Sequence, residues 1–165
     1  MGYASTVMRP PRYPLEPLAK LREDQADAAV RGLAVAVAGR DAAERARRTV
    51  EQQRDDQEAA ASRVRDAEQE ALARGELRAA DLARAGAWET RVASEGEAMA
   101  SAVERARGAE SQASEVEQSA QREVAARKAG AEVVGADRAR WEDALRKKRE
   151  AREEEAAEEA FRRKP

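Results

Sequence analysis

Two runs of charged residues carry the side chains with the most obvious chemical potential in this sequence. The glutamates at 153–155 could hold a cation, and the basic residues at 146–149 could contact phosphate groups. However, the chain has no histidine and no cysteine, the usual ligands of zinc and iron, and the basic run is flanked by as many acidic residues. Gly75 and Gly86 stand alone, without the spacing of a phosphate-binding loop. We therefore expect no catalytic residues, no metal site, no cofactor and no nucleic-acid partner.

The composition favours an elongated helical protein over a compact one. Charged residues make up 39% of the 165 residues and aromatic residues only 3%. Much of the hydrophobic content is alanine, which buries little area, so a multilayer core would be difficult to build. Interleaved charges of both signs among Ala, Glu, Arg and Leu are typical of long helices and coiled coils. Because a pair of helices encloses almost no concave interior, this composition argues against an enzyme.

Proline and glycine predict where the helices begin and end. Four of the five prolines lie between Met8 and Pro17, which predicts an extended segment and a helix that begins near Pro17. Gly75 suits a left-handed cap just after a helix end, with Arg74 placing positive charge beside the last carbonyls. The predicted segments are a leader, a first helix, a turn and a second helix, over residues 1–16, 17–74, 75–80 and 81–163.

A stripe of apolar and small residues at spacings of four and three predicts the face of the second helix that packs against the first. This predicted seam contains Trp88, Val92, Glu95, Met99, Ala102, Ala106, Ala109, Ala113, Val116 and Ala120. It then slips by one residue and resumes at Val124, Arg127, Ala131, Val134, Arg138, Trp141 and Leu145. We therefore expect a change of register near residues 120–124. The larger apolar residues of the first helix are less regular: Leu18, Leu21, Leu33, Val37, Val50, Val64 and Leu72.

Together these features predict an all-α fold: a long antiparallel two-helix coiled-coil hairpin with a proline-rich N-terminal leader and a projecting C-terminal helix. A turn at Gly75 leaves the second helix longer than the first, which would put Trp141 and Leu145 on an unpaired projection that could await a partner. A hairpin is a complete two-helix unit, so we expect a monomer. No run of about 20 apolar residues is present for a membrane span, and the N-terminus lacks the apolar stretch of a signal peptide, so we expect a cytoplasmic protein.

Three segments resemble one known family. The opening Tyr13-Pro-Leu-Glu-Pro-Leu-Ala-Lys-Leu-Arg-Glu-Asp-Gln-Ala26 resembles the aromatic-x-Leu-x-x-Leu-x-x-Leu-Arg start of the flagellar FliJ proteins. Its second half also resembles the Leu-Arg-Glu-Asp-x-Ala of the injectisome YscO proteins. Gly75 to Trp88 is similar to the FliJ turn and the helix start after it, and Trp141 to Lys164 resembles the charged C-terminal helix. The proline-rich leader and the alanine content depart from the family pattern.

The resemblance implies a non-enzymatic central stalk of a type III secretion export apparatus, peripheral at its cytoplasmic face. In this family the paired terminal ends insert into the hexameric secretion ATPase, the region towards the turn contacts the cytoplasmic domain of the export gate, and export chaperones also bind. On this sequence, the resemblance implies ATPase contacts at Leu15, Leu18, Leu21, Arg22, Trp141, Leu145 and Arg149. It implies export-gate contacts at Trp88 and Val92.

Two other classes of function compete with the stalk. A scaffold or stator-type coiled coil would be a parallel dimer, so oligomeric state separates it from a monomeric hairpin. A nucleic-acid-associated coiled coil would bind DNA with a steep dependence on salt. The sequence leaves open whether a stalk would serve a flagellar or an injectisome system, because Tyr13-Pro-Leu-Glu-Pro-Leu favours the first and Leu-Arg-Glu-Asp-x-Ala the second.

Overall fold

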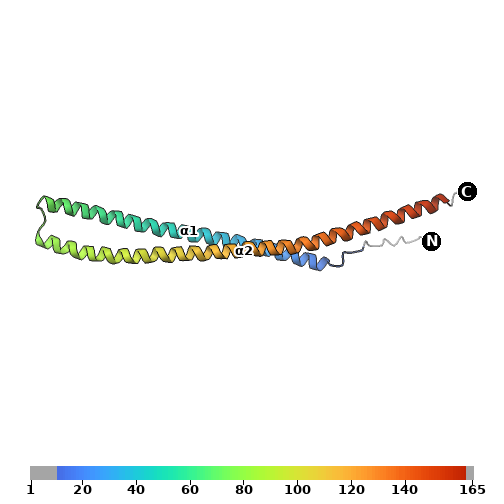
Figure 1. Ribbon diagram of the computed structural model, residues 1–165, viewed down its shortest axis with the longest axis horizontal. Helices are drawn as coiled ribbons and strands as arrows, with labels where there is room; N and C mark the ends of the chain where they lie inside the picture. The colour runs from blue at the N-terminus through green and yellow to red at the C-terminus, as the bar shows by residue number, and fades with distance from the viewer. Residues whose placement is uncertain (1–10, 163–165) are drawn as a thin grey trace, which may run out of the picture. The chain divides into compact units, whose positions relative to one another are not determined.

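Two long helices packed against each other make up the fold. The computed structural model describes residues 11–162, so most of the predicted leader lies outside the described residues. Helix α1 runs from Glu16 to Ala73 and helix α2 from Ala79 to Arg162, with 58 and 84 residues (Figure 1). No strand occurs between residues 11 and 162, so the all-helical prediction is confirmed for that range. The predicted helices began at residues 17 and 81, against Glu16 and Ala79 in the structure.

Helix α1 begins after a single turn that ends at Leu15. The Glu16 amide donates to the Tyr13 carbonyl at 3.2 Å, and the Ala19 amide donates to the Leu15 carbonyl at 2.9 Å. Pro17 stands in the first turn of the helix, where its missing N–H group has no intrahelical acceptor to lose. A proline that would break a helix interior is therefore compatible with this start.

The turn between the helices is held by a Schellman cap. Gly75 has a φ of 67°; its amide donates to the Leu72 carbonyl, and the Glu76 amide donates to the Ala71 carbonyl, both at 3.0 Å. On the other side, the Arg78 amide donates to the Asp81 carboxylate at 2.9 Å, as in a capping box. This hydrogen bond and the neighbouring Arg84 lower the pKa of Asp81. Both helix ends at the turn are thus satisfied by local groups.

The same substitution should have opposite effects at two glycines. Gly75→Ala should destabilise the fold by about 1 kcal/mol, because a Cβ is strained at positive φ. Gly96→Ala should stabilise it by up to about 1 kcal/mol, because Gly96 lies inside α2 and an added Cβ would meet no atom within 4 Å. Urea unfolding followed by circular dichroism measures both changes. Equal changes at the two positions would contradict the turn geometry.

Contacts divide the chain into two units. The turn unit comprises residues 33–120, and the terminal unit comprises the described parts of residues 1–32 and 121–165. In the turn unit, Arg40 pairs with Glu117, Arg47 with Glu110, and Arg65 with Glu89. Partner numbers on α2 fall as those on α1 rise, so the two segments run in opposite directions there.

The buried face of α2 follows one unbroken repeat. Buried and half-buried residues recur at spacings of four and three along α2: Met99, Val103, Ala106, Glu110, Ala113, Glu117, Ala120, Val124, Arg127, Ala131, Val134, Arg138, Trp141 and Leu145. The predicted change of register near 120–124 is therefore wrong. Val103 is 2% exposed, whereas Val116, which the apolar stripe placed in the seam, is 58% exposed. Glu110 and Glu117 hold seam positions because arginines of α1 neutralise them.

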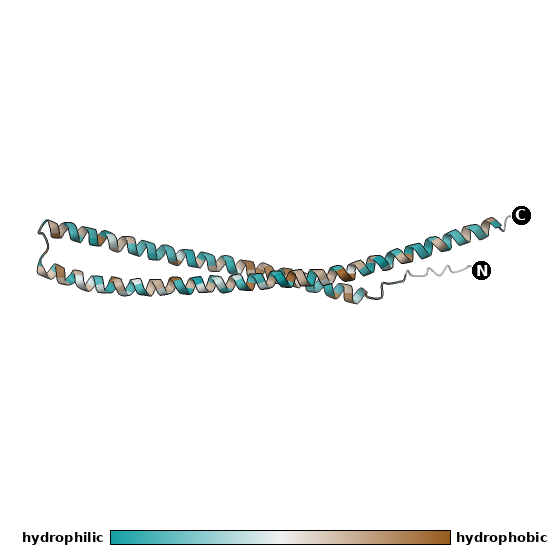
Figure 2. Ribbon diagram, viewed as in Figure 1, coloured by the Kyte–Doolittle hydropathy of each residue, from teal (hydrophilic) through white to brown (hydrophobic). Residues whose placement is uncertain are grey.

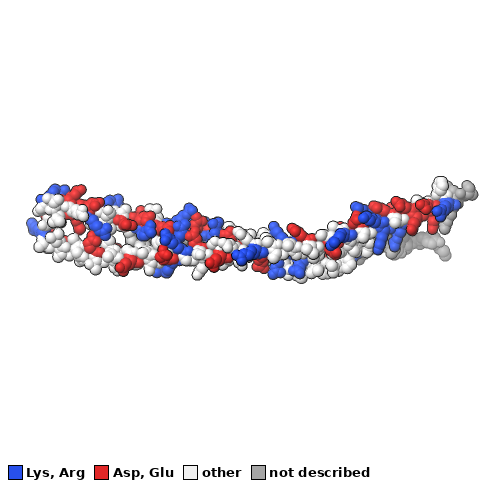
Figure 3. Space-filling model, viewed as in Figure 1, with Lys and Arg blue, Asp and Glu red and all other residues white. Residues whose placement is uncertain are grey.

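The matching face of α1 is built mainly from alanine and arginine. It comprises Ala19, Arg22, Ala26, Ala29, Leu33, Ala36, Arg40, Ala43, Arg47, Val50 and Arg54. Among the larger apolar residues of α1, Leu21, Val64 and Leu72 are more than 40% exposed. Apolar residues are scattered among hydrophilic ones on both helices (Figure 2), and charges of both signs are interleaved over the visible face (Figure 3). Packing energy along this seam is consequently small for each layer.

Candidate protein-interaction sites

A groove of about 530 Å³ lies between α1 and α2 in the turn unit. It is lined by Arg54, Gln57, Glu58, Ala60, Ala61, Val64, Arg65, Trp88, Val92, Ala93, Glu95, Gly96 and Met99. Gly96 lies three residues before Met99 and four after Val92, so it continues the spacing of the α2 seam but contributes no side chain. Ala61 supplies only a methyl group from α1. The groove therefore forms where the seam lacks side-chain volume.

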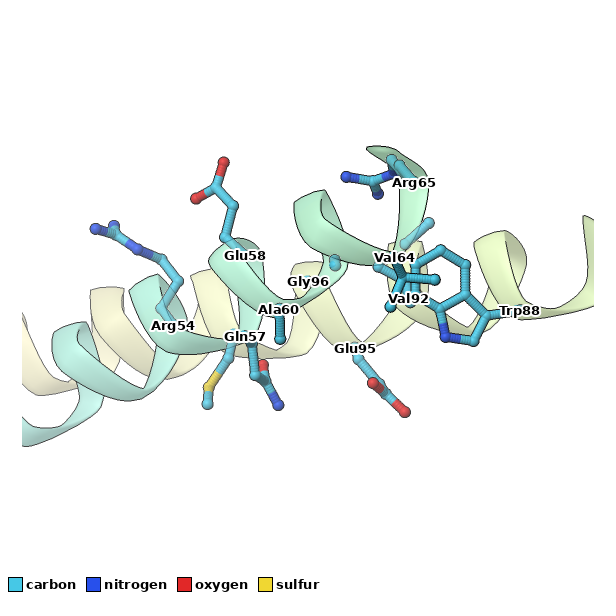
Figure 4. A pocket seen from close by; sticks show the side chains of 13 residues that line it. Arg54, Gln57, Glu58, Ala60, Val64, Arg65, Trp88, Val92, Glu95 and Gly96 are labelled. Carbon is cyan, nitrogen blue, oxygen red and sulfur yellow. The ribbon is translucent and has the colours of Figure 1, made fainter. Parts of the chain in front are cut away.

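Apolar side chains converge at one end of the groove. Trp88, Val92 and Val64 lie close together beside Arg65, whereas the carboxylates of Glu58 and Glu95 point away from them (Figure 4). The Arg65 guanidinium lies 6.0 Å from the centre of the Trp88 ring, within the range of a cation–π contact. Glu89 accepts two hydrogen bonds from Arg65, at 2.9 and 3.3 Å, and raises the pKa of Arg65. This paired arginine holds one wall of the groove in place.

A smaller hollow of about 270 Å³ lies nearer the turn. Its lining includes three leucines, Leu72, Leu77 and Leu82. Leu72 is 55% exposed and Leu82 is 48% exposed. Exposed apolar side chains thus line this hollow as well as the groove, and Arg65 lines both.

An aromatic cluster joins the start of α1 to α2 in the terminal unit. The buried Tyr13 ring meets the Trp141 ring edge-on, with centroids 5.5 Å apart and planes at 61°. Its hydroxyl donates to the Asp137 carboxylate at 2.6 Å. Arg138 adds an ion pair with Glu16 at 3.3 Å. Tyr13 belongs to the aromatic-x-Leu motif but was not predicted as a contact residue, because its partners lie more than 120 residues away in the sequence.

Alkaline titration should report this cluster directly. The hydrogen bond to Asp137, with a smaller contribution from burial, raises the pKa of Tyr13 from 10.0 to about 12. The folded state therefore favours the neutral phenol, and this contribution to stability is complete below about pH 10 and is lost as the pH rises through about 12. In a Tyr3→Phe variant, Tyr13 is the remaining tyrosine. In the folded variant, the tyrosinate absorbance of Tyr13 should appear at a pH about two units higher than in the same variant unfolded in urea. A midpoint near pH 10 in both states would contradict the contact with Asp137.

The residues predicted to contact an ATPase divide into exposed and half-buried sets. Leu15, Leu21 and Arg149 are exposed, whereas Leu18, Arg22, Trp141 and Leu145 are half-buried. The prediction that Trp141 lies on an unpaired projection is wrong, because Tyr13 packs against it. The prediction for Leu145 is also wrong in part, since that side chain is half-buried. The reason is that Tyr13, which precedes the predicted start of the first helix at residue 17, also packs against α2 and so lengthens the paired region.

The C-terminal part of α2 has no apolar partner among the described residues. Every residue from 146 to 162 is exposed, and Phe161 is 81% exposed. Ion pairs within the helix stabilise the segment, including Arg146 with Glu150 and Lys147 with Asp143. The projecting segment therefore begins after Leu145.

No site for a metal ion or a membrane span emerges from the described chain. Within residues 11–162, no three acidic side chains gather as potential metal ligands. None of the helices in that range combines the length and apolar character that crossing a membrane requires. Comparisons with protein-family models, with curated proteins and with solved structures find no match to this chain.

Proposed function

We propose that this protein is a non-enzymatic central stalk of a type III secretion export apparatus. In this proposal the two helices form an antiparallel coiled-coil hairpin, monomeric when free and located in the cytoplasm at the face of the apparatus. Its terminal ends bind the hexameric secretion ATPase, its turn unit contacts the cytoplasmic domain of the export gate, and export chaperones are additional partners.

The observation that carries the proposal is the aromatic cluster. The two terminal segments that resemble the FliJ and YscO proteins are far apart in the sequence, yet Tyr13 of the first packs against Trp141 of the second. Glu16 and Arg138 join the same two segments through an ion pair. A partner that recognises both ends of the chain would therefore meet them as one surface, with Leu15 and Leu21 exposed on it.

Binding to the cognate ATPase tests the proposal. The purified protein should co-migrate with the hexameric ATPase in size-exclusion chromatography and stimulate ATP hydrolysis. Leu15→Asp/Leu21→Asp should abolish both effects without unfolding the chain, because the two side chains are 44% and 51% exposed. Val35→Asp, at a 74% exposed position of the turn unit, is the matched control and should leave binding unchanged. Failure of the unmodified protein to bind or stimulate the ATPase would refute the stalk.

Oligomeric state separates the stalk from a scaffold or stator-type coiled coil. A stalk of this kind is a monomer, whereas the scaffold would be a parallel dimer. Light scattering on the purified protein gives the mass in solution, and distance measurements between spin labels at the two chain ends give the direction of pairing. Finding a parallel dimer would refute the stalk and support the scaffold.

A further inference from the structure

Charged residues occupy the packed face of both helices in the turn unit at intervals of seven residues. Arg40, Arg47 and Arg54 share one seam position of α1, and Glu110 and Glu117 share one seam position of α2. All five residues are half-buried, although the side chains of Arg40 and Arg54 keep 39% of their surface exposed. Such positions usually hold apolar residues in a coiled coil, and polar residues there are used to set register and partner at a cost in stability.

Two interhelical ion pairs, here called the seam ladder, join these positions. The Arg40 Nε atom lies 2.8 Å from the Glu117 carboxylate, in a geometry that forms no hydrogen bond. The Arg47 Nε atom donates to Glu110 at 2.5 Å. The Arg47 and Glu110 side chains are 23% and 29% exposed. They are therefore less exposed than an ordinary surface pair of this chain, such as Arg65 and Glu89 at 42% and 44%. Arg47 also pairs with Glu51, which in turn pairs with Arg107 of α2 at 3.1 Å.

The layers next to these ion pairs distinguish poorly between alternative pairings. Ala43 and Ala113 lie between the two ion pairs, and Val50 and Ala106 form the next layer towards the turn; all four are small and recur at heptad spacing. A displaced or reversed pairing would bring similar small residues together, so the free energy gained by burying apolar surface would change little. Charge therefore decides which pairing is favoured.

Other pairings place like charges together. A parallel pair of two α1 helices sets Arg40, Arg47 and Arg54 against their own copies, and a parallel pair of two α2 helices does the same for the glutamates. Half-buried like charges without partners are strongly unfavourable. A heptad shift that brings Arg47 opposite Glu117 and Arg54 opposite Glu110 keeps two ion pairs, but it needs a displacement of about 10 Å. The short turn between Ala73 and Ala79 opposes that displacement.

We propose that the seam ladder selects the pairing partner of each helix: α1 accepts an α2 helix in one antiparallel register and rejects another α1. A second copy of this chain can then bind only by arm exchange, in which α1 of one copy pairs with α2 of the other. Arg40, Arg47, Glu110 and Glu117 are the specificity-determining residues. This inference rests on the turn unit alone and is independent of the proposed role in secretion.

Charge reversal of one side of the ladder tests the inference. Arg40→Glu/Arg47→Glu leaves glutamates on both helices, and Glu110→Arg/Glu117→Arg leaves arginines on both. Each double variant should lower the midpoint of thermal unfolding by about 5 °C or more. The quadruple variant restores opposite charges and should recover most of that loss. Arg45→Glu/Arg63→Glu is the matched control, because it makes the same charge change at exposed positions of the turn unit.

Mixing the two double variants tests arm exchange. After joint unfolding and refolding, an equimolar mixture should form a heterodimer of twice the monomer mass that unfolds at a higher temperature than either variant alone. Double variants as stable as the unmodified chain, or a quadruple variant no more stable than the doubles, would overturn partner selection by the ladder. A mixture that yields no heterodimer would overturn arm exchange.

Discussion

Under the proposed stalk function, replacing Trp88 with alanine is expected to weaken binding to the cytoplasmic domain of the export gate by about tenfold or more. Trp88 is the aromatic side chain of the groove, and it lies beside Val92 and Val64 against the cation of Arg65 (Figure 4). A large aromatic residue in a partly desolvated groove is the kind of residue that dominates binding energy at protein interfaces. Isothermal titration calorimetry with the cognate gate domain measures the change.

A second variant tests whether the groove itself is the binding site. Gly96→Leu should place a side chain into the groove, because an added Cβ at Gly96 meets no atom within 4 Å. This variant should lose gate binding to a similar degree while its helix content and thermal stability are kept or increased. Leu82→Ala, in the smaller hollow, is the control for a general loss of apolar surface. Unchanged affinity in both Trp88→Ala and Gly96→Leu would exclude the groove as the gate contact.

Val103→Ala should destabilise the fold by about 2 kcal/mol, because it removes two buried methyl groups and leaves a cavity. Val103 is 2% exposed and stands in the seam of α2, between Met99 and Ala106. Ala106, the next seam residue towards the C-terminus, contributes only a methyl group, so few other contacts can compensate. This is the largest loss of stability that we expect from removing methyl groups of any one valine in the turn unit.

Val116→Ala provides the matched control for Val103. It removes the same two methyl groups from the same helix, but Val116 is 58% exposed, so its effect should stay within about 0.5 kcal/mol. Urea unfolding of both variants gives the two free energies. Because the apolar stripe in the sequence placed Val116 rather than Val103 at the helix interface, equal effects or a reversed order would favour that stripe over the observed packing.

The helix ends were predictable because local chemistry determines them. Pro17 cannot occupy a helix interior but is compatible with a first turn, and Gly75 accepts the positive φ that ends α1. These constraints act within a few residues of each position. They can therefore be read without knowing where the rest of the chain lies.

The packed faces were less predictable because the buried residues are not the most apolar ones. The stripe through Ala102, Ala109 and Val116 is more hydrophobic than the seam that contains Glu110 and Glu117. A glutamate becomes acceptable at a packed position only when an arginine from the other helix lies opposite. The groove could not be predicted from the sequence either, because it depends on which residues of α1 lie opposite Gly96, which has no side chain to fill the seam.

Two long helices, the glycine turn between them and the lack of histidine and cysteine could be predicted without the fold, since each depends only on composition or on local backbone limits. The register of the seam, the contact between Tyr13 and Trp141, and the groove beside Trp88 arise only from the packing of the two helices. Those features depend on pairs of residues far apart in the chain, and in a seam of alanines and balanced charges no single-helix pattern distinguishes one pairing from the next.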